Sequence, residues 1–298
     1  MPSPDSLIAD AKSLYTRMQS GTLRPDDILS GWWAKYRKDG EILPKLRRDI
    51  NLFNVKFPGF IGAYSPFRIF DEKSAVLDVG AHWGYSVVAM RHQGLKSRIH
   101  SIEALPQNTR ELARLRKVED GRYDFTQVAA TETPCQLTFY IPAINGVAVT
   151  GLNSTGGTLL DYYAGLLASL VQTYPAKKGR PNRFQLIVVK VAGRPIDHIV
   201  DDLKLADSIV AIKMDVEGHE APALRGARRL LGREKPMLMV EGANRDAGVE
   251  TEMRSHGYQH HELRDSLLHL HEDISMAQDG YWLHPKHFEF YRQSGLMA

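Results

Sequence analysis

The chain has 298 residues, of which 43% are hydrophobic and 24% are charged, and this is enough to build a full buried core. Its formal net charge of +3 at pH 7, with basic residues scattered along the chain, argues against nucleic acid as a partner. The single cysteine, Cys135, excludes an internal disulfide and a cysteine zinc cluster, so we predict a cytoplasmic protein with this cysteine in its core.

Residues 1–70 predict a helical accessory region in front of the main domain. Apolar residues recur there at helical spacing up to Gly21, and Pro25 opens a second helix. We expect neither a signal peptide nor a membrane span, because the first residues are charged and no apolar run approaches about 20 residues. Trp32 and Trp33 suit packing onto the main domain, covering a substrate pocket, or contacting a second copy in a homo-oligomer.

From residue 74 onward, apolar runs alternate with amphipathic segments, which predicts an α/β fold with parallel strands. The predicted strands are 75–79, 98–103, 123–129, 208–214 and 236–241, and the predicted helices are 84–93, 106–118, 195–203 and 220–231. We expect added β segments at 136–141 and 183–191, and an antiparallel edge from 258–263, 267–271 and 280–284. The main domain is therefore predicted over 71–298. It contains a long insertion, 143–183, which is either a surface loop or a lid over an acidic or phosphorylated substrate.

The segment 76–86 is an apolar strand that runs into a glycine turn and the start of a helix. Gly80 and Gly84 let the backbone approach a ligand closely, and Glu103, which ends the next strand, is placed to accept hydrogen bonds from ribose hydroxyls. Asp78 stands where a dinucleotide fingerprint has its first glycine, so it would repel a pyrophosphate. An acid there suits the cationic amino-acid end of S-adenosylmethionine, which we predict as the cofactor.

The segment 213–220 repeats the order of strand, acid, glycine and helix. His219 is suited to act as a general base because the unperturbed pKa of histidine is about 6.5, although a solvent-facing histidine at a helix start is an equal alternative. Asp215, Glu241 and Asn244 are suited to hold Mg²⁺, which would lower the pKa of a substrate hydroxyl.

Carboxyl groups follow four predicted strands, at Asp78, Glu103, Asp215 and Glu241. Each alone is compatible with capping a helix, but together they predict a site at one edge of the sheet.

These motifs resemble those of the FkbM family of S-adenosylmethionine-dependent methyltransferases. That family has a Val-Leu-Asp-Val-Gly-Ala turn, present at 76–81, and an Ile-Asp-Val-Glu-Gly box, present at 214–218 with Met214 in place of isoleucine. A Leu-x-Gly-Ala helix follows at 224–227, and the resemblance covers about 74–284. It implies a Rossmann-like, seven-stranded, mostly parallel sheet with an antiparallel last strand. It also implies methyl transfer to an oxygen of a sugar, glycolipid or polyketide-type acceptor.

Carried over to this chain, the resemblance implies a set of site residues. The cofactor positions would be Asp78, Gly80, Ala81, His82, Gly84, Tyr85, Glu103, Ala104, Ala129 and Asp215, with Glu103 at the ribose and Ala129 at the adenine. We expect catalytic roles for Asp215, Glu217 and His219, and acceptor binding by Asn153, Ser154, Glu241 and Asn244. The metal hypothesis comes from a looser similarity to catechol O-methyltransferases, through the Gly-x-x-x-Gly-Tyr-Ser element at 80–86.

Two other functions remain open. A nicotinamide-dependent dehydrogenase is favoured by the βαβ unit and Glu103 but opposed by Asp78. A non-catalytic binding protein on the same fold would use Trp32, Trp33 and the insertion for a partner.

Overall fold

The computed structural model describes residues 61–144, 147–148, 184–241, 247–271 and 279–297. The chain divides into two compact units. Among the described residues, the smaller unit holds 136–144, 147–148 and 184–191, and the larger holds the rest. The predicted helices before residue 60 and most of the insertion lie outside the described residues, so the domain boundaries at 70/71 and 143–183 stay predictions.

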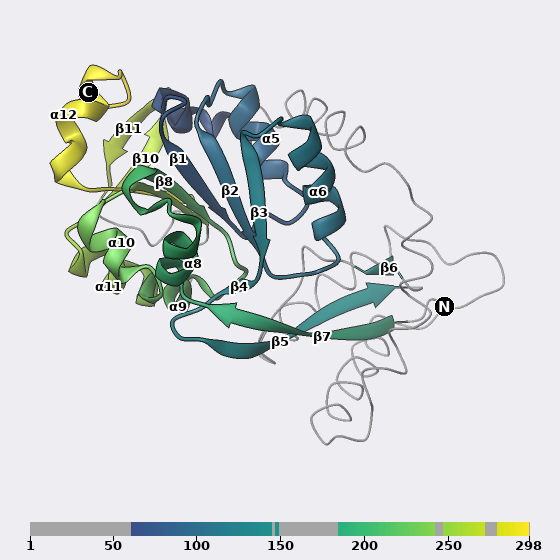
Figure 1. The fold of residues 1–298 in the computed structure, drawn as a ribbon. Coiled ribbons are helices and arrows are strands. Elements are labelled where there is room, and N and C mark those ends of the chain that lie inside the picture. The colour runs from purple at the N-terminus through teal and green to yellow at the C-terminus, as the bar shows by residue number, and fades with distance from the viewer. Residues whose placement is uncertain (1–60, 145–146, 149–183, 242–246, 272–278, 298) are drawn as a thin grey trace, which may run out of the picture. The chain divides into compact units, whose positions relative to one another are not determined.

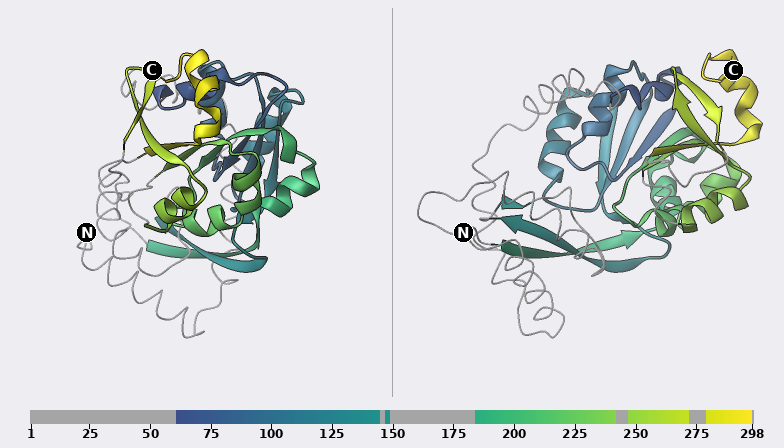
Figure 2. Two further views of the ribbon diagram at one scale, coloured as in Figure 1. Left: turned by 90° about the vertical axis from the view of Figure 1, so that its left-hand side faces the viewer. Right: turned by 180° about the vertical axis from the view of Figure 1, so that it is seen from behind.

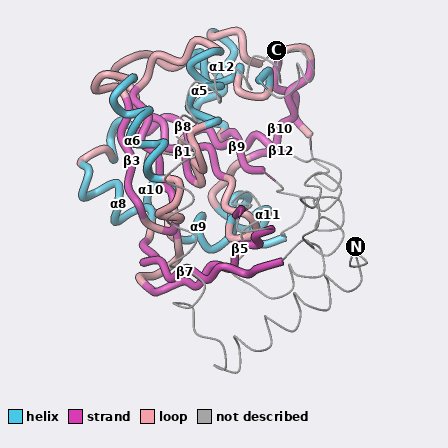
Figure 3. Tube along the Cα trace, turned by 90° about the vertical axis from the view of Figure 1, so that its right-hand side faces the viewer, coloured by secondary structure: helices cyan, strands magenta, loops and turns pink. Residues whose placement is uncertain are grey.

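The larger unit is built on an eight-stranded sheet in the order β11-β10-β12-β9-β8-β1-β2-β3 (Figures 1 and 3). Its parallel strands are β1 (Ala75–Val79), β2 (Arg98–Glu103), β3 (Tyr123–Gln127), β8 (Ile209–Met214) and β9 (Met237–Glu241). The antiparallel strands are β12 (Asp279–Leu283), β10 (Gln259–Arg264) and β11 (Leu267–Leu270). The α/β fold and the antiparallel edge are thus confirmed.

The sheet has one strand more than the expected seven, because a hairpin extends its antiparallel edge. Strands β10 and β11 are joined by Asp265 and Ser266, both in the left-handed region at φ 50° and φ 68°. Two consecutive positive φ values match the twist of a two-residue hairpin turn. The hairpin pairs with β12, which in turn pairs with β9.

Helices cover both faces of this sheet (Figure 2). One face carries α5 (Tyr85–His92) and α6 (Thr109–Val118), and the other carries α8 (Ile196–Leu203), α9 (Glu220–Arg225), α10 (Arg228–Arg233) and α11 (Ala247–Ser255). Strand β1 packs on both faces of the sheet. Leu77 and Val79 pack with the second group of helices, and Val76 packs with the first. Burial on both faces explains why the central strands β1 and β8 are apolar at nearly every position.

Short helices lie near the amino ends of β8 and β9. They are η1 (Ser65–Ile69), η3 (Ala206–Ser208), η5 (Pro285–His287) and the C-terminal α12 (Phe288–Gln293). The segment around α12 lies on the edge hairpin: Leu268 bridges Met297, and Tyr291 joins the hydrophobic cluster that contains Leu268. Residues before β1 and at the C-terminus thereby pack on the same face as α5 and α6.

Three sequence predictions need correction. The predicted helix 220–231 is broken at Gly226, where a Cβ would overlap the carbonyl oxygen of Thr131. The predicted strand 123–129 ends at Gln127, and Ala129–Ala130 form β4, which pairs with the end of β7 (Phe184–Arg194). Cys135 is exposed rather than in the core. Helices α11 and α12 were not predicted.

The smaller unit contains β5 (Cys135–Ile144) and β6 (Val147–Ala148), which pair antiparallel, and most of β7. These strands confirm the β segments predicted at 136–141 and 183–191, and with β4 they form a sheet in the order β4-β7-β5-β6. Across the described parts of both units, no helix is long and apolar enough to cross a bilayer.

Candidate active site

The predicted strand-end acids do meet at one edge of the large sheet. Register places Asp78 beside Lys213 and Val79 beside Met214, and β9 continues the same edge with Met214 beside Val240. The backbone beyond the strands stays joined, since Gly80 N–H donates to Ile102 O at 2.8 Å and Asp215 N–H donates to Val79 O at 3.0 Å. The turns after β1, β2 and β8 therefore form one continuous rim, the place where α/β sheets bind ligands.

Gly80 and Gly84 are required by contacts within the protein. Gly80 has φ 80°, and a Cβ there would overlap the carbonyl oxygen of Asp215, so this glycine lets the turn after β1 touch the end of β8. Gly84 has φ 87°, begins α5, and lies where a Cβ would be 2.7 Å from Leu115 on α6. The two glycines thus let this turn pack closely against the end of β8 and against α6.

Glu103 holds the turn after β1 from the neighbouring strand. Its Oε2 accepts from His82 N–H at 2.7 Å, and its Oε1 accepts from Leu105 N–H at 2.8 Å and from Asn108 Nδ2 at 3.0 Å. The side chain is buried, and burial raises the pKa of Glu103 to about 7. An ionised carboxylate has about four acceptor sites, so one on Oε2 is left for a ligand hydroxyl.

Asp78 lies below the rim, fully buried inside β1. Its oxygens accept from Ser86 Oγ at 2.8 Å and from Ser101 Oγ at 2.9 Å, and Lys213 Nζ lies 3.8 Å from Oδ1. Burial raises the pKa of Asp78, and Lys213 opposes that effect. This carboxylate therefore ties α5 and β2 to β1.

Aromatic rings line the turn after β1. His82, in the left-handed region at φ 50°, stacks on Trp83 with ring centroids 4.7 Å apart, and Trp83 stacks on Tyr85 at 6.4 Å. Burial lowers the pKa of His82 to about 4, so its imidazole is neutral near pH 7. A packing role for this histidine agrees with these contacts.

Lys213 is the central residue of the site, and the sequence analysis gave it no role. Its buried Nζ donates to Gly80 O at 3.1 Å and to Asp215 Oδ2 at 3.2 Å, besides lying near Asp78. Tyr64, buried before β1, is electrostatically coupled to the same ammonium. The available signal was a lysine between Ile212 and Met214 in an otherwise apolar strand.

Asp215 is paired with Lys213 on one side and with Glu241 on the other. Burial alone would raise the pKa of Asp215, but Lys213 and a hydrogen bond with Glu241 hold it below its usual range. An ammonium beside the carboxylate disfavours a divalent cation there, so the donor set does not fit the predicted metal. Asn244 lies outside the described residues, and within them no three His, Cys, Asp or Glu side chains are grouped to hold a metal.

The turn after β8 is held by an acid that the sequence analysis missed. Buried Glu220, at the start of α9, accepts from Val216 N–H at 3.0 Å and from Gly218 N–H at 3.2 Å, and burial raises its pKa. Glu217 is exposed with φ 54°. His219 is half-buried at the helix start, and burial together with Arg225 lowers its pKa.

The remaining predicted positions are placed as follows. Ala81 is buried in the core beside α5, the carbonyl of half-buried Ala104 accepts from Gln127 Nε2 at 2.7 Å, and Ala129 is buried in β4. Asn153 and Ser154 lie outside the described residues. Gln107, a further candidate not predicted, is buried, and its amide atoms have no partner among the described residues.

Comparison with known proteins gives one family and several solved structures. Residues 78–273, more than half of the chain, match the methyltransferase FkbM domain. Comparison with curated proteins gave no significant match.

Among solved structures, a methyltransferase FkbM from Methylobacillus flagellatus is 20% identical with a TM-score of 0.43, covering 74% of this chain and 47% of its own. This chain thus spans about half the length of that protein. Aeropyrum pernix fibrillarin, solved with S-adenosylmethionine, is 12% identical with a TM-score of 0.34, covering 74% of this chain and 75% of its own. A TehB-like methyltransferase from Corynebacterium glutamicum is 10% identical with a TM-score of 0.35, covering 74% of this chain and 85% of its own.

Proposed function

Because this chain belongs to the FkbM methyltransferase family, we propose that it binds S-adenosylmethionine at the rim and methylates a hydroxyl group. The acceptor we propose is a sugar, glycolipid or polyketide-type molecule. One observation carries the proposal: Lys213 joins the turn after β1, where the cofactor would bind, to Asp215, where the acceptor would bind. The two halves of a transfer site are thus held in one geometry, and alignment is the main source of catalysis in such a reaction.

The residues around the first turn fit this cofactor. Glu103 keeps one acceptor site for a ribose hydroxyl. The Gln107 side-chain amide and Asn108 Oδ1, which have no partner among the described residues, lie four and five residues after it and would face the adenosine part. Asp215, ionised beside Lys213, brings a carboxylate to the rim for the cationic part of the ligand. When bound, S-adenosylmethionine supplies a methyl group on a sulfonium.

The residues after β8 would handle the acceptor. A new bond forms between the acceptor oxygen and the methyl carbon as the bond from that carbon to sulfur breaks, so the hydroxyl proton must leave. We assign the proton to the imidazole of His219, which is neutral near pH 7 because its pKa is lowered by burial. Asp215 stays ionised beside Lys213 and is placed to orient the hydroxyl as a hydrogen-bond acceptor.

Calorimetry tests the cofactor first. Wild type and Glu103→Ala are titrated with S-adenosylmethionine, S-adenosylhomocysteine and NAD, with Glu72→Ala as the control because Glu72 is an exposed acid before β1. We expect both adenosyl ligands to bind wild type and the control but not Glu103→Ala. Binding of NAD alone would favour the dehydrogenase, and no binding would refute the cofactor assignment.

Turnover tests the catalytic residues. With an acceptor found by screening hydroxylated sugars and polyketides for methyl uptake, Asp215→Asn and His219→Ala should each lower kcat while S-adenosylhomocysteine still binds. Wild-type turnover in both variants would contradict their roles. Cofactor binding without methyl transfer to any acceptor would favour the non-catalytic alternative.

A further inference from the structure

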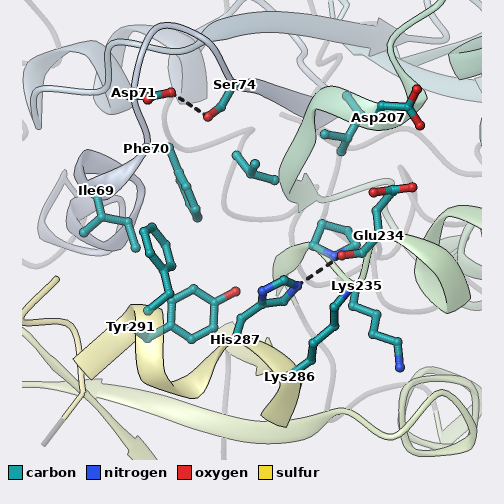
Figure 4. Close-up of a pocket in the computed structure, with 14 residues that line it drawn as sticks. Ile69, Phe70, Asp71, Ser74, Asp207, Glu234, Lys235, Lys286, His287 and Tyr291 are labelled. Carbon is teal, nitrogen blue, oxygen red and sulfur yellow. Dashed lines mark hydrogen bonds between the residues drawn. The ribbon is translucent and has the colours of Figure 1, made fainter. Parts of the chain in front are cut away.

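A second cavity lies at the opposite edge of the large sheet (Figure 4). Its volume is about 390 Å³, within the range of small-molecule sites. Its lining includes Phe70, Phe290, Lys235, Lys286, Asp207 and Glu234. Strand β8 starts at Ile209 and β9 starts just after Pro236, so the cavity is at the amino ends of strands whose carboxyl ends form the rim.

One wall of the cavity is aromatic. Phe70 and Phe290 stack with ring centroids 6.2 Å apart and planes 25° from parallel, and Tyr291 is buried beside them. Figure 4 shows the rings of Phe70, Tyr291 and His287 turned toward the same space. Phe290 is one of the few large apolar side chains of the described residues that stay exposed, at 43%. A flat apolar ligand would cover this wall and remove it from water.

Two of the three acids of the cavity share one arginine, and the third, Asp71, keeps its charge. Arg233 pairs with Asp207 at 2.5 Å and with Glu234 at 2.9 Å. Asp71 accepts from Ser74 Oγ at 2.8 Å and from Lys73 N–H at 3.0 Å.

Neither lysine of the cavity, Lys235 or Lys286, forms an ion pair with any described residue. The ammonium of Lys235 lies 2.8 Å from Nε2 of His284, whose pKa is lowered by burial and by Lys235, so that ring is a neutral acceptor. His287 adds a ring nitrogen 3.2 Å from Glu234 O. Lys235 and Lys286 are thus the cations of the lining that no described carboxylate holds, and Figure 4 shows them apart from Asp71.

We propose that this cavity binds a small aromatic anion. Its ring would lie against Phe70 and Phe290, and its carboxylate, phosphate or sulfonate group would pair with Lys235 and Lys286. Such charge-assisted contacts favour an anion over a neutral molecule of the same shape. Because this site and the rim lie at opposite ends of β8 and β9, the two are occupied independently.

Three probes with one ring system test the charge preference on the full-length protein. They are 2-naphthalenesulfonate, neutral 2-naphthylmethanol and cationic 2-naphthylmethylammonium, each titrated by calorimetry. We expect the sulfonate to bind at least about tenfold more tightly than the other two. Equal binding of the three probes would overturn the proposal.

Variants locate the site. Lys235→Gln/Lys286→Gln should weaken sulfonate binding about tenfold, and Phe290→Ala should weaken it as well. The matched control is Lys96→Gln/Lys117→Gln, which removes two exposed lysines elsewhere and should leave the affinity unchanged. Thermal unfolding checks that each variant is folded.

Saturating S-adenosylhomocysteine separates this cavity from the rim. It should leave sulfonate binding unchanged, even if the proposed methyl transfer is wrong. Displacement of the sulfonate by S-adenosylhomocysteine, or unchanged affinity in the lysine variant, would place the probe elsewhere and refute this site.

Discussion

The two turns of the candidate site, 80–84 after β1 and 215–219 after β8, are held in shape by different contacts. Each contains a non-glycine residue in the left-handed region, His82 at φ 50° and Glu217 at φ 54°. A buried glutamate accepts backbone N–H groups of each turn. In the first turn that glutamate is Glu103, from a neighbouring strand, whereas in the second it is Glu220, from the helix that follows.

The first turn is held by a contact between segments that are far apart in the sequence, whereas the second is held mainly by contacts within one segment. The first turn keeps its shape only when β2 is in register with β1, because Glu103 and His82 are 21 residues apart. The second turn is closed by contacts two and four residues apart, between Glu220 and Gly218 or Val216, and its first residue, Asp215, bonds to β1, at Val79 O. We conclude that the first turn depends on the assembled sheet, and that the second depends more on contacts within its own segment.

The largest effect on stability is expected from a glycine substitution in the first turn, compared with one in the second. Gly80→Ala should destabilise the protein by about 5 kcal/mol or prevent folding, because the new Cβ overlaps the carbonyl oxygen of Asp215. Gly218→Ala should cost only about 1 kcal/mol, since Gly218 has φ 87° but open space around it. Urea unfolding of both variants measures the difference, and equal stabilities would show that the first turn is not packed against β8.

Lys213→Met removes the ammonium that joins the two turns. We expect a loss of about 3–4 kcal/mol of stability, because the Asp78 and Asp215 carboxylates lose the ammonium that compensates their charge. Adding Asp215→Asn should restore part of the loss if the pairing with Asp215 matters. Additive effects in this double-variant cycle, followed by urea unfolding, would mean that the turns are independent.

Glu103→Ala and Glu220→Ala compare the two buried acids directly. The first leaves three donors without an acceptor and should cost about 3 kcal/mol, and the second leaves two and should cost about 2 kcal/mol. Calorimetry should show that only Glu103→Ala loses S-adenosylhomocysteine binding. A similar loss in Glu220→Ala would show that the turns do not divide cofactor and acceptor between them.

The smallest expected effect is a pH dependence of the first turn. The pKa of Glu103 is raised to about 7, so its ionised form, which under the proposed function accepts a ribose hydroxyl, is depleted below that pH. S-adenosylhomocysteine should bind about tenfold more weakly at pH 6 than at pH 8. The unliganded protein has the opposite dependence: a raised pKa favours the folded state at low pH, and that contribution is lost as the pH rises from about 4.5 through 7. Calorimetry across this range, with Glu103→Gln as the pH-insensitive control, checks both signs.

The sequence alone determined the strands, the order of strand and helix, the antiparallel edge and the two glycine motifs. It could do so because apolar runs, helical spacing and turn residues depend on neighbours a few positions away. The predicted ends of β1 and β2 agree with the structure to the residue, and the acids predicted for one edge do lie on it.

Only the tertiary structure decided what those residues touch. Lys213 reaches Gly80 across 133 residues, Thr131 occupies the space that a side chain at position 226 would need, and Ala129–Ala130 leave the large sheet to pair with β7. Such contacts join segments that are far apart in the sequence, so no pattern among neighbouring residues predicts them. The sequence could therefore point to the edge where the site lies, whereas the buried lysine that joins its two turns was visible only in the fold.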